Sequence, residues 1–126
     1  MRTVVLKESE PGETRVPITP QVVSRLTQLG AVVAVERGLG SAALIPDAEY
    51  VEAGAEVGER AALLAGADLL LHLNPPPPEV VDGLKEGAVL AGFLDPFFEP
   101  ALVARLAERN LSAIAMELVP RSTYAQ

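Results

Sequence analysis

The sequence predicts an α/β fold: an open, doubly wound, mainly parallel sheet of about five strands with helices on both faces. Two observations support this. Short aliphatic runs that are typical of buried strands alternate along the chain with short helical patterns. In addition, no hairpin turn joins successive strands, as expected where each connection crosses over the sheet. The 126 residues, 49% of them hydrophobic, are enough for a single α/β domain with its own core.

The first βαβ unit is predicted from residues 3–35. Thr3–Leu6 is a short run of β-branched and aliphatic residues and is taken as the first strand. Thr19 and Pro20 match a helix N-cap followed by proline at the first helical position, and Gly30 is expected to end that helix. Four aliphatic residues follow the cap at helical spacing: Val22, Val23, Leu26 and Leu29. Residues 31–35 form the second strand.

The next segment resembles a nucleotide-binding loop but is interpreted as a plain turn. Residues 38–43 fit the pattern G-x-G-x-x-G/A, yet Pro46 follows too closely for the helix that a dinucleotide fingerprint requires. Asp47 is expected to cap a short helix that ends at Gly54, and residues 55–57 are expected to form a minor strand.

The second half of the chain continues the alternation and ends strands at prolines. Predicted strands are 68–73, 88–94 and 112–118, and predicted helices are 59–65, 79–84 and 100–108. The tract Pro75–Pro78 is expected to be a rigid loop at the end of a strand. The resulting order of elements is Rossmann- or flavodoxin-like.

Composition excludes several classes of function. Ten Lys and Arg against 17 Asp and Glu give a net charge of −7, which argues against a nucleic-acid surface. The absence of cysteine removes disulfides and Cys-ligated zinc, and a single histidine, His72, removes a His-rich metal site, so no metal is expected. No apolar stretch is long enough for a signal peptide or a spanning helix, so the expected location is cytoplasmic.

Ligands of such sheets bind outside the carboxyl ends of the strands, and four residues there are candidates. Arg15 and Arg121 follow the first and the last strand, and His72 and Asp95 stand at two strand ends. Arg15 is suited to clamp a carboxylate or phosphate, or else forms an ion pair with Glu13 or Glu117. His72 is either a hydrogen-bonded core residue or a catalyst paired with Asp95. Asp95 is otherwise a simple strand stop, and Arg121 otherwise belongs to an ordinary polar terminus.

Several motifs in fixed order carry a family resemblance that covers the whole chain. They are Glu13-x-Arg15-Val16-x-x-Thr19-Pro20, Leu29-Gly30, Val35-Glu36-x-Gly38-x-Gly40, Ala53-Gly54-Ala55 and Ala67-Asp68-Leu69-Leu70-Leu71. This set resembles the N-terminal domain of the alanine dehydrogenase and pyridine nucleotide transhydrogenase family. The stretch from Ala115 to Arg121, followed by Ala125-Gln126, resembles the transhydrogenase branch, in the NAD(H)-binding domain I of its alpha subunit.

The resemblance implies a role as part of an enzyme. Residues 1–126 would be the first lobe of a two-lobed NAD(H)-binding domain and one wall of the NAD(H) cleft, inactive alone. The complete NAD(P) transhydrogenase transfers hydride between NAD(H) and NADP(H), coupled to proton translocation. The implied partners are the remaining lobe of the same subunit and the membrane-embedded and NADP(H)-binding subunits, which would hold the chain at the inner membrane. A homodimer is one option for its assembly.

The same resemblance assigns site residues. Arg121 would hold the nicotinamide side of the nucleotide, and Gln126 would lie beside the hydride-transfer partner as the catalytic position. Arg15 is the third cofactor-binding candidate. Tyr124 stands where the family usually has arginine, which is a departure from the pattern.

Two alternatives stay open. In the alanine dehydrogenase branch the residue matching Arg15 binds the substrate carboxylate, a lysine stands at the position of His72 and a histidine at that of Asp95. This chain keeps only the arginine. The other alternative is a non-catalytic module that docks to partner subunits or binds a small anion through Arg15 and Arg121.

Overall fold

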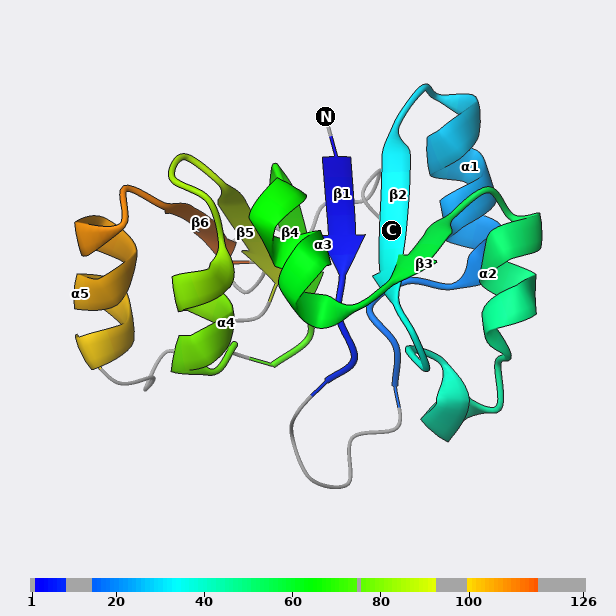
Figure 1. Ribbon diagram of the computed structural model, residues 1–126, viewed down its shortest axis with the longest axis horizontal. Helices are drawn as coiled ribbons and strands as arrows, with labels where there is room; N and C mark the ends of the chain where they lie inside the picture. Colours follow the sequence, from blue (N-terminus) through cyan, green and yellow to red (C-terminus); the bar gives the residue numbers. More distant parts are fainter. Residues whose placement is uncertain (1, 9–14, 75, 93–99, 116–126) are drawn as a thin grey trace, which may run out of the picture.

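The computed structural model describes residues 2–8, 15–74, 76–92 and 100–115, with the backbone alone at 100–103 and 115. These residues form a six-stranded sheet in the order β3-β2-β1-β4-β5-β6, with β1 near its centre (Figure 1). The strands are β1 (Arg2–Val5), β2 (Val32–Glu36), β3 (Glu56–Gly58), β4 (Leu69–His72), β5 (Val89–Gly92) and β6 (Ser112–Ala115). The helices are α1 (Pro20–Gln28), the 3-10 turn η1 (Ser41–Ala43), α2 (Asp47–Glu52), α3 (Arg60–Gly66), α4 (Pro78–Gly83) and α5 (Pro100–Glu108).

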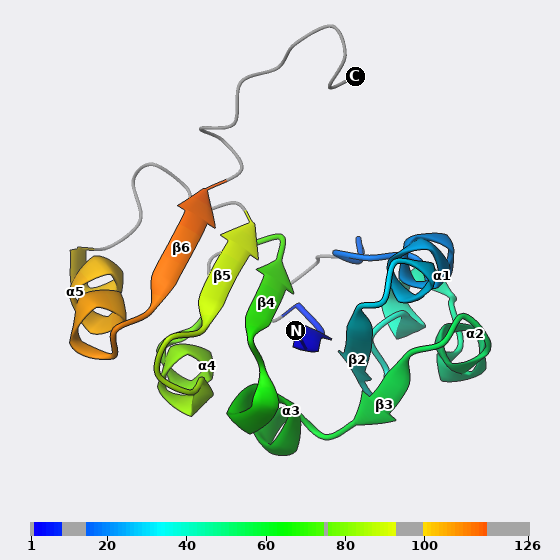
Figure 2. The ribbon, with the colours of Figure 1, turned by 90° about the horizontal axis from the view of Figure 1, so that it is seen from above.

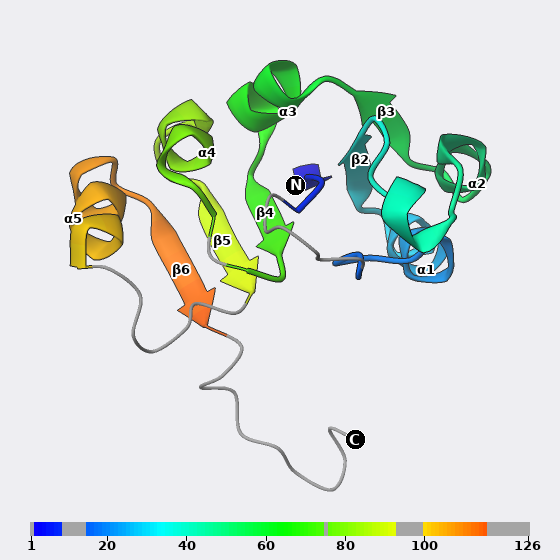
Figure 3. The same ribbon diagram turned by 90° about the horizontal axis from the view of Figure 1, so that it is seen from below.

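Every pair of neighbouring strands in this sheet is parallel. Strands β4, β5 and β6 run side by side in one direction (Figure 3). The order 3-2-1-4-5-6 is that of a doubly wound Rossmann-like sheet, so the predicted fold class is confirmed. The minor strand expected at 55–57 is the edge strand β3.

Helices cover both faces of the sheet, with α1 and α2 on one side and α3, α4 and α5 on the other (Figure 2). Successive strand side chains point to opposite faces, so each strand supplies two cores. Val4 of β1 packs with the side chains beneath α3–α5, and its neighbour Val5 packs with those beneath α1 and α2. In β2, Ala34 belongs to the first core, and Val33 and Val35 belong to the second.

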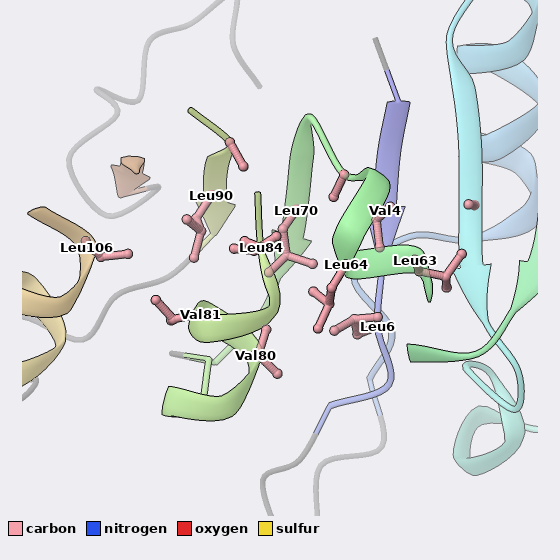
Figure 4. Close-up of a cluster of buried hydrophobic side chains, with 13 residues drawn as sticks. Val4, Leu6, Leu63, Leu64, Leu70, Val80, Val81, Leu84, Leu90 and Leu106 are labelled. Atoms are coloured by element: carbon pink, nitrogen blue, oxygen red, sulfur yellow. The ribbon is translucent and has the colours of Figure 1, made fainter. Parts of the chain in front are cut away.

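The α3–α5 layer, by which we mean the core beneath these three helices, consists of aliphatic side chains. Leu70 and Leu90 from the strands meet Leu64, Val81 and Leu84 from α3, α4 and the end of α4 (Figure 4). Leu90 is completely buried. These aliphatic side chains have no hydrogen-bonding group of their own, so they stabilise the fold by burial and close packing.

The α1–α2 layer, the core beneath α1 and α2, contains a buried polar group. Tyr50 of α2 is fully buried, and its hydroxyl donates a hydrogen bond to the carbonyl of Ile18 over 2.9 Å. Burial raises the pKa of the Tyr50 phenol above its ordinary value, because the charged form would lose its hydration. Tyr50 thereby connects α2 to the segment that leads into α1.

Helix α1 begins and ends as the sequence predicts. The Thr19 side chain accepts a hydrogen bond from the backbone N–H of Val22 over 3.4 Å, and Pro20 occupies the first helical position. Gly30 follows with a φ of +93°, in the left-handed region that favours glycine at a helix end.

Two local expectations were wrong. Asp47 does not cap α2: Pro46 is the N-cap, and the Asp47 carboxylate accepts hydrogen bonds from the backbone N–H of Gly38 instead. The four aliphatic residues at helical spacing also do not share one buried face. Val23 is buried and Leu26 packs against the same core, whereas Val22 and Leu29 are exposed by 46% and 79%.

Asp68 makes charged contacts at the amino ends of β1 and β4. At the amino ends, Asp68 forms an ion pair with Lys85 and accepts a hydrogen bond from the backbone N–H of Arg2. These contacts hold the pKa of Asp68 below its ordinary value.

None of the helices that the structure describes is both long and apolar enough to span a membrane.

Candidate functional site

A crevice opens where the sheet changes its winding direction. Strand β1 pairs with β2 on one side and with β4 on the other, and the chain leaves β1 and β4 toward opposite faces of the sheet. Ligands of open α/β sheets bind at this switch point, outside the carboxyl ends of the strands. A cavity of about 130 Å³ lies at this place.

Its lining combines polar side chains with an apolar floor. The polar residues are Lys7, Glu8, Arg60, His72 and Asn74. The apolar residues are Leu6, Leu70, Leu71, Pro76, Pro77 and Val80. Such a mixture of apolar surface and a few convergent polar groups is typical of small-molecule sites.

Glu8 connects the two loops that border the crevice. It lies three residues after β1, and its carboxylate accepts hydrogen bonds from the loop that follows β4. The donors are the backbone N–H of Leu73 at 3.1 Å, the backbone N–H of Asn74 at 2.9 Å and the Asn74 side-chain amide at 3.1 Å. The carboxyl ends of β1 and β4 are therefore held at a fixed separation.

A second set of contacts secures the β1 loop from the opposite side. Arg60, the first residue of α3, binds the Glu36 carboxylate through two nitrogens at 3.1 and 2.9 Å. The same guanidinium donates to the Lys7 carbonyl at 2.9 Å, and the Lys7 backbone N–H donates to Glu36 at 2.7 Å. Arg60 and Glu36 thus position the backbone just beyond β1.

His72 ends β4 with its side chain held inside the protein. Its Nδ1 lies 3.1 Å from the Asn74 carbonyl oxygen, and the residue is 7% exposed. The imidazole lies against Gly92 of β5, its partner in the sheet register: a Cβ added there would come within 2.6 Å of Nδ1 and 2.8 Å of Cε1. This burial agrees with the interpretation of His72 as a hydrogen-bonded core residue, although the residue also lines the cavity.

The charges around the crevice are balanced. Lys7 and Arg60 contribute two positive charges, and Glu8 and Glu36 contribute two negative charges, with Arg60 paired to Glu36 at 2.9 Å. These groups therefore do not create the excess positive charge of a phosphate site. Across the described part of the chain, no group of three or more His, Asp or Glu side chains is arranged to hold a metal ion.

The sequence-predicted site residues fall in different places. His72 lines the crevice, and Arg15 lies exposed in the segment that leads into α1. Arg121 and Gln126 lie outside the residues that the structure describes, as do Asp95, Tyr124 and the two glutamates expected to pair with Arg15, Glu13 and Glu117.

Sequence reasoning missed Glu8, Arg60 and Asn74. Glu8 and Asn74 both stand within three residues of a predicted strand end, so their position could have indicated them. Their contact joins residues 66 positions apart, however, and no short motif records it.

Comparison with known proteins identifies the family. The model of the family described as "Alanine dehydrogenase/PNT, N-terminal domain" matches residues 4–126. An NAD(P) transhydrogenase subunit alpha polypeptide of Rhodospirillum rubrum is 39% identical, over 100% of this chain and 34% of its own length.

Two solved structures share the fold. A transhydrogenase from Sinorhizobium meliloti gives a TM-score of 0.89 at 39% identity, covering 98% of this chain and 37% of that one. An L-alanine dehydrogenase gives a TM-score of 0.85 at 28% identity, covering 91% and 32%. The chain thus spans about a third of the length of the relatives it resembles. It belongs to the family of alanine dehydrogenase/PNT N-terminal domains.

Proposed function

We propose that this chain is the first lobe, residues 1–126, of the NAD(H)-binding domain of an NAD(P) transhydrogenase alpha subunit, and that it forms one wall of the NAD(H) cleft. Family membership and the 39% identity to the Rhodospirillum rubrum subunit support this. The observation that carries the choice of branch is His72. By the resemblance it takes the position of a lysine of the alanine dehydrogenase branch, and its ring is buried against Gly92 and close to the Asn74 carbonyl.

This arrangement suits direct hydride transfer. In the proposed reaction a hydride passes from one nicotinamide to another, so the protein needs to orient two rings and exclude water, and no side chain has to accept a proton. The apolar floor of the crevice and its balanced charge fit a wall that excludes water. The loops that border it are already fixed by Glu8 and Arg60.

The residues proposed to contact nucleotide are Arg15, Arg121 and Gln126. Arg121 would hold the nicotinamide side, and Gln126 would lie at the hydride-transfer position. Arg15 is exposed on the segment between the crevice and α1, and its guanidinium is suited to bind an anionic group of the nucleotide.

The assembly proposed for this chain follows from the same role. NAD(H) would lie between this lobe and the remaining lobe of the subunit, with NADP(H) on a partner subunit. Membrane-embedded subunits would hold the assembly at the cytoplasmic side of the inner membrane, and the complete domain would form a homodimer.

A chimera tests the proposal. The aligned segment of the Rhodospirillum rubrum relative is replaced by this chain, and hydride transfer from NADPH to an NAD analogue is measured by absorbance with the other transhydrogenase subunits present. We expect transfer well above that of the relative lacking the segment. The Arg121→Ala chimera should bind NADH roughly tenfold or more weakly, and Arg25→Ala, which removes an exposed arginine of α1, should bind it as the unchanged chimera does.

Two further measurements test the proposal, the first against the alanine dehydrogenase alternative and the second for the two-lobed cleft. The chimera should not reduce NAD⁺ with alanine as the donor; alanine-dependent turnover would favour the alternative. The 126-residue chain alone should bind NADH weakly, because half of the proposed cleft belongs to the other lobe. Submicromolar binding in calorimetry would contradict the two-lobed cleft.

A further inference from the structure

The loop after β4 presents three hydrogen-bond donors to a single carboxylate. The Glu8 Oε2 atom accepts from the backbone N–H of Leu73, and Oε1 accepts from the backbone N–H and the side-chain amide of Asn74. All three distances lie between 2.9 and 3.1 Å. Both oxygens of the carboxylate are therefore engaged by a loop 65 and 66 positions away in the sequence.

These donors have the character of an anion site. Successive backbone N–H groups that point to one place form a concave cradle for an anion, and hydrogen bonds to a charged acceptor are stronger than those between neutral groups. The cradle here is divided between two oxygens, which suits a planar carboxylate. In the folded chain its occupant is an internal side chain.

We propose that Leu73 and Asn74 form a carboxylate-binding site whose resident ligand is Glu8, and that the site accepts a free monocarboxylate when the Glu8 carboxylate is removed. Glu8 is then a positioning residue: its carboxylate determines where the β4 loop lies. Because the Asn74 carbonyl lies 3.1 Å from His72 Nδ1, the same contact also places the partner of the imidazole. The contacts lie within the chain, so the inference does not depend on the proposed function.

Glu8→Ala provides a direct test, since acetate contains the atoms that this substitution removes. The variant lacks Cγ and the carboxyl group, which correspond to the methyl and carboxylate of acetate. The melting temperature of the variant is measured in sodium acetate and in sodium chloride at equal ionic strength. At concentrations about twice the dissociation constant, acetate should raise the melting temperature by about 2–4 °C more than chloride does.

The backbone amide resonances of Leu73 and Asn74 give a site-specific readout. In the ¹H–¹⁵N spectrum of the variant, both should shift relative to the unmodified chain, and acetate should return them toward their original positions. A structural role without a binding site would not produce this return. If the variant is unfolded in chloride, the same titration is read as the folded fraction by circular dichroism, and acetate should increase it.

Two control variants sharpen the result. Glu52→Ala removes an exposed carboxylate from α2, and should show no response specific to acetate. Glu8→Gln keeps one acceptor oxygen for Asn74 but turns an amide N–H₂ toward the Leu73 N–H, so it should be destabilised and should not respond to acetate, because the side chain still fills the site. An equal response of Glu8→Ala to acetate and chloride, whether the variant is folded or unfolded, would overturn the proposal.

Discussion

The two core layers of the sheet are built from the same strands but differ in what they do. The α3–α5 layer consists of Val, Leu and Ala side chains, including Leu70 and Leu90. The α1–α2 layer contains Tyr50, whose buried hydroxyl binds the Ile18 carbonyl over 2.9 Å. Ile18 directly precedes the Thr19 cap and follows Arg15 by three residues. The first layer packs apolar side chains and, through Leu6, Leu70 and Val80, also forms part of the crevice floor. The second fixes, through a directional hydrogen bond, the end of a segment that carries a candidate ligand-binding residue.

The two layers of this doubly wound sheet therefore rely on different interactions. Changing the shape of a side chain in an aliphatic core costs packing energy. Such side chains form no directional hydrogen bond. A buried hydroxyl adds a directional contact whose loss leaves an acceptor without its donor. Substitutions in the two layers should consequently have different signatures.

The largest effect is expected from Leu90→Ala in the α3–α5 layer. Leu90 is fully buried, so its truncation should lower the free energy of unfolding by about 2–5 kcal/mol. Urea denaturation followed by circular dichroism measures this loss. Ile114→Ala, in the neighbouring strand and 51% exposed, should change stability much less. Equal losses for the two variants would contradict the assignment of this layer as the stabilising core.

A smaller effect is expected from Tyr50→Phe in the α1–α2 layer. The ring and its packing are kept, but the Ile18 carbonyl loses its donor, which should cost about 1–3 kcal/mol. Hydrogen exchange of the amides between Arg15 and Thr19 should quicken, whereas exchange in β5 should follow global stability alone. Unchanged exchange near Ile18 would show that the hydroxyl does not fix this segment.

The same substitution has a pH signature. Burial raises the folded-state pKa of Tyr50 above its unfolded value of about 10, so the stabilisation of its neutral form is fully present below pH 10 and is lost as pH rises through the folded-state pKa. Tyr50→Phe lacks this contribution. The stability difference between the two proteins should therefore narrow above about pH 10, which paired urea titrations can measure.

The smallest effect concerns the loop next to the α1–α2 layer and has the opposite sign. Leu44 has a φ of 61° and a ψ of 31°, a left-handed conformation that is unfavourable for leucine. The residue is 91% exposed, so burial of its side chain offsets little of this conformational energy. Leu44→Asn should raise the free energy of unfolding by up to about 1 kcal/mol, because asparagine adopts this conformation more readily. Leu44→Ala keeps the penalty and should not stabilise. A loss of stability in Leu44→Asn would show that the leucine makes a contact worth more than the strain.

The fold was largely predictable because its signals are local. Strand runs, the Thr19-Pro20 start of α1 and the Gly30 end each depend on a few neighbouring residues, and all three are confirmed. Strand ends were less predictable: the strand expected at 68–73 is β4, Leu69–His72. The last residues of the expected strand 88–94 lie outside the described part. Asp47 was misassigned because its carboxylate binds a backbone N–H nine positions earlier and not one in its own helix.

The candidate site was less predictable, for a physical reason. Its position at strand carboxyl ends follows from topology, and His72 was correctly placed there. The contacts that shape it connect distant positions: Glu8 to Asn74 and Arg60 to Lys7. Such pairs form only after the sheet brings the loops together, so neither the composition of the sequence nor the spacing of its residues predicts them.

The close approach of His72 to Gly92 has a consequence for how this sequence can evolve. A side chain at position 92 would occupy the space of the imidazole and would also collide with the His72 carbonyl oxygen. Position 92 is therefore not free to change alone: a larger residue there requires a different strand separation as well as a different residue at 72. Among descendants of this sequence, a larger residue at 92 should appear only together with a substitution at 72.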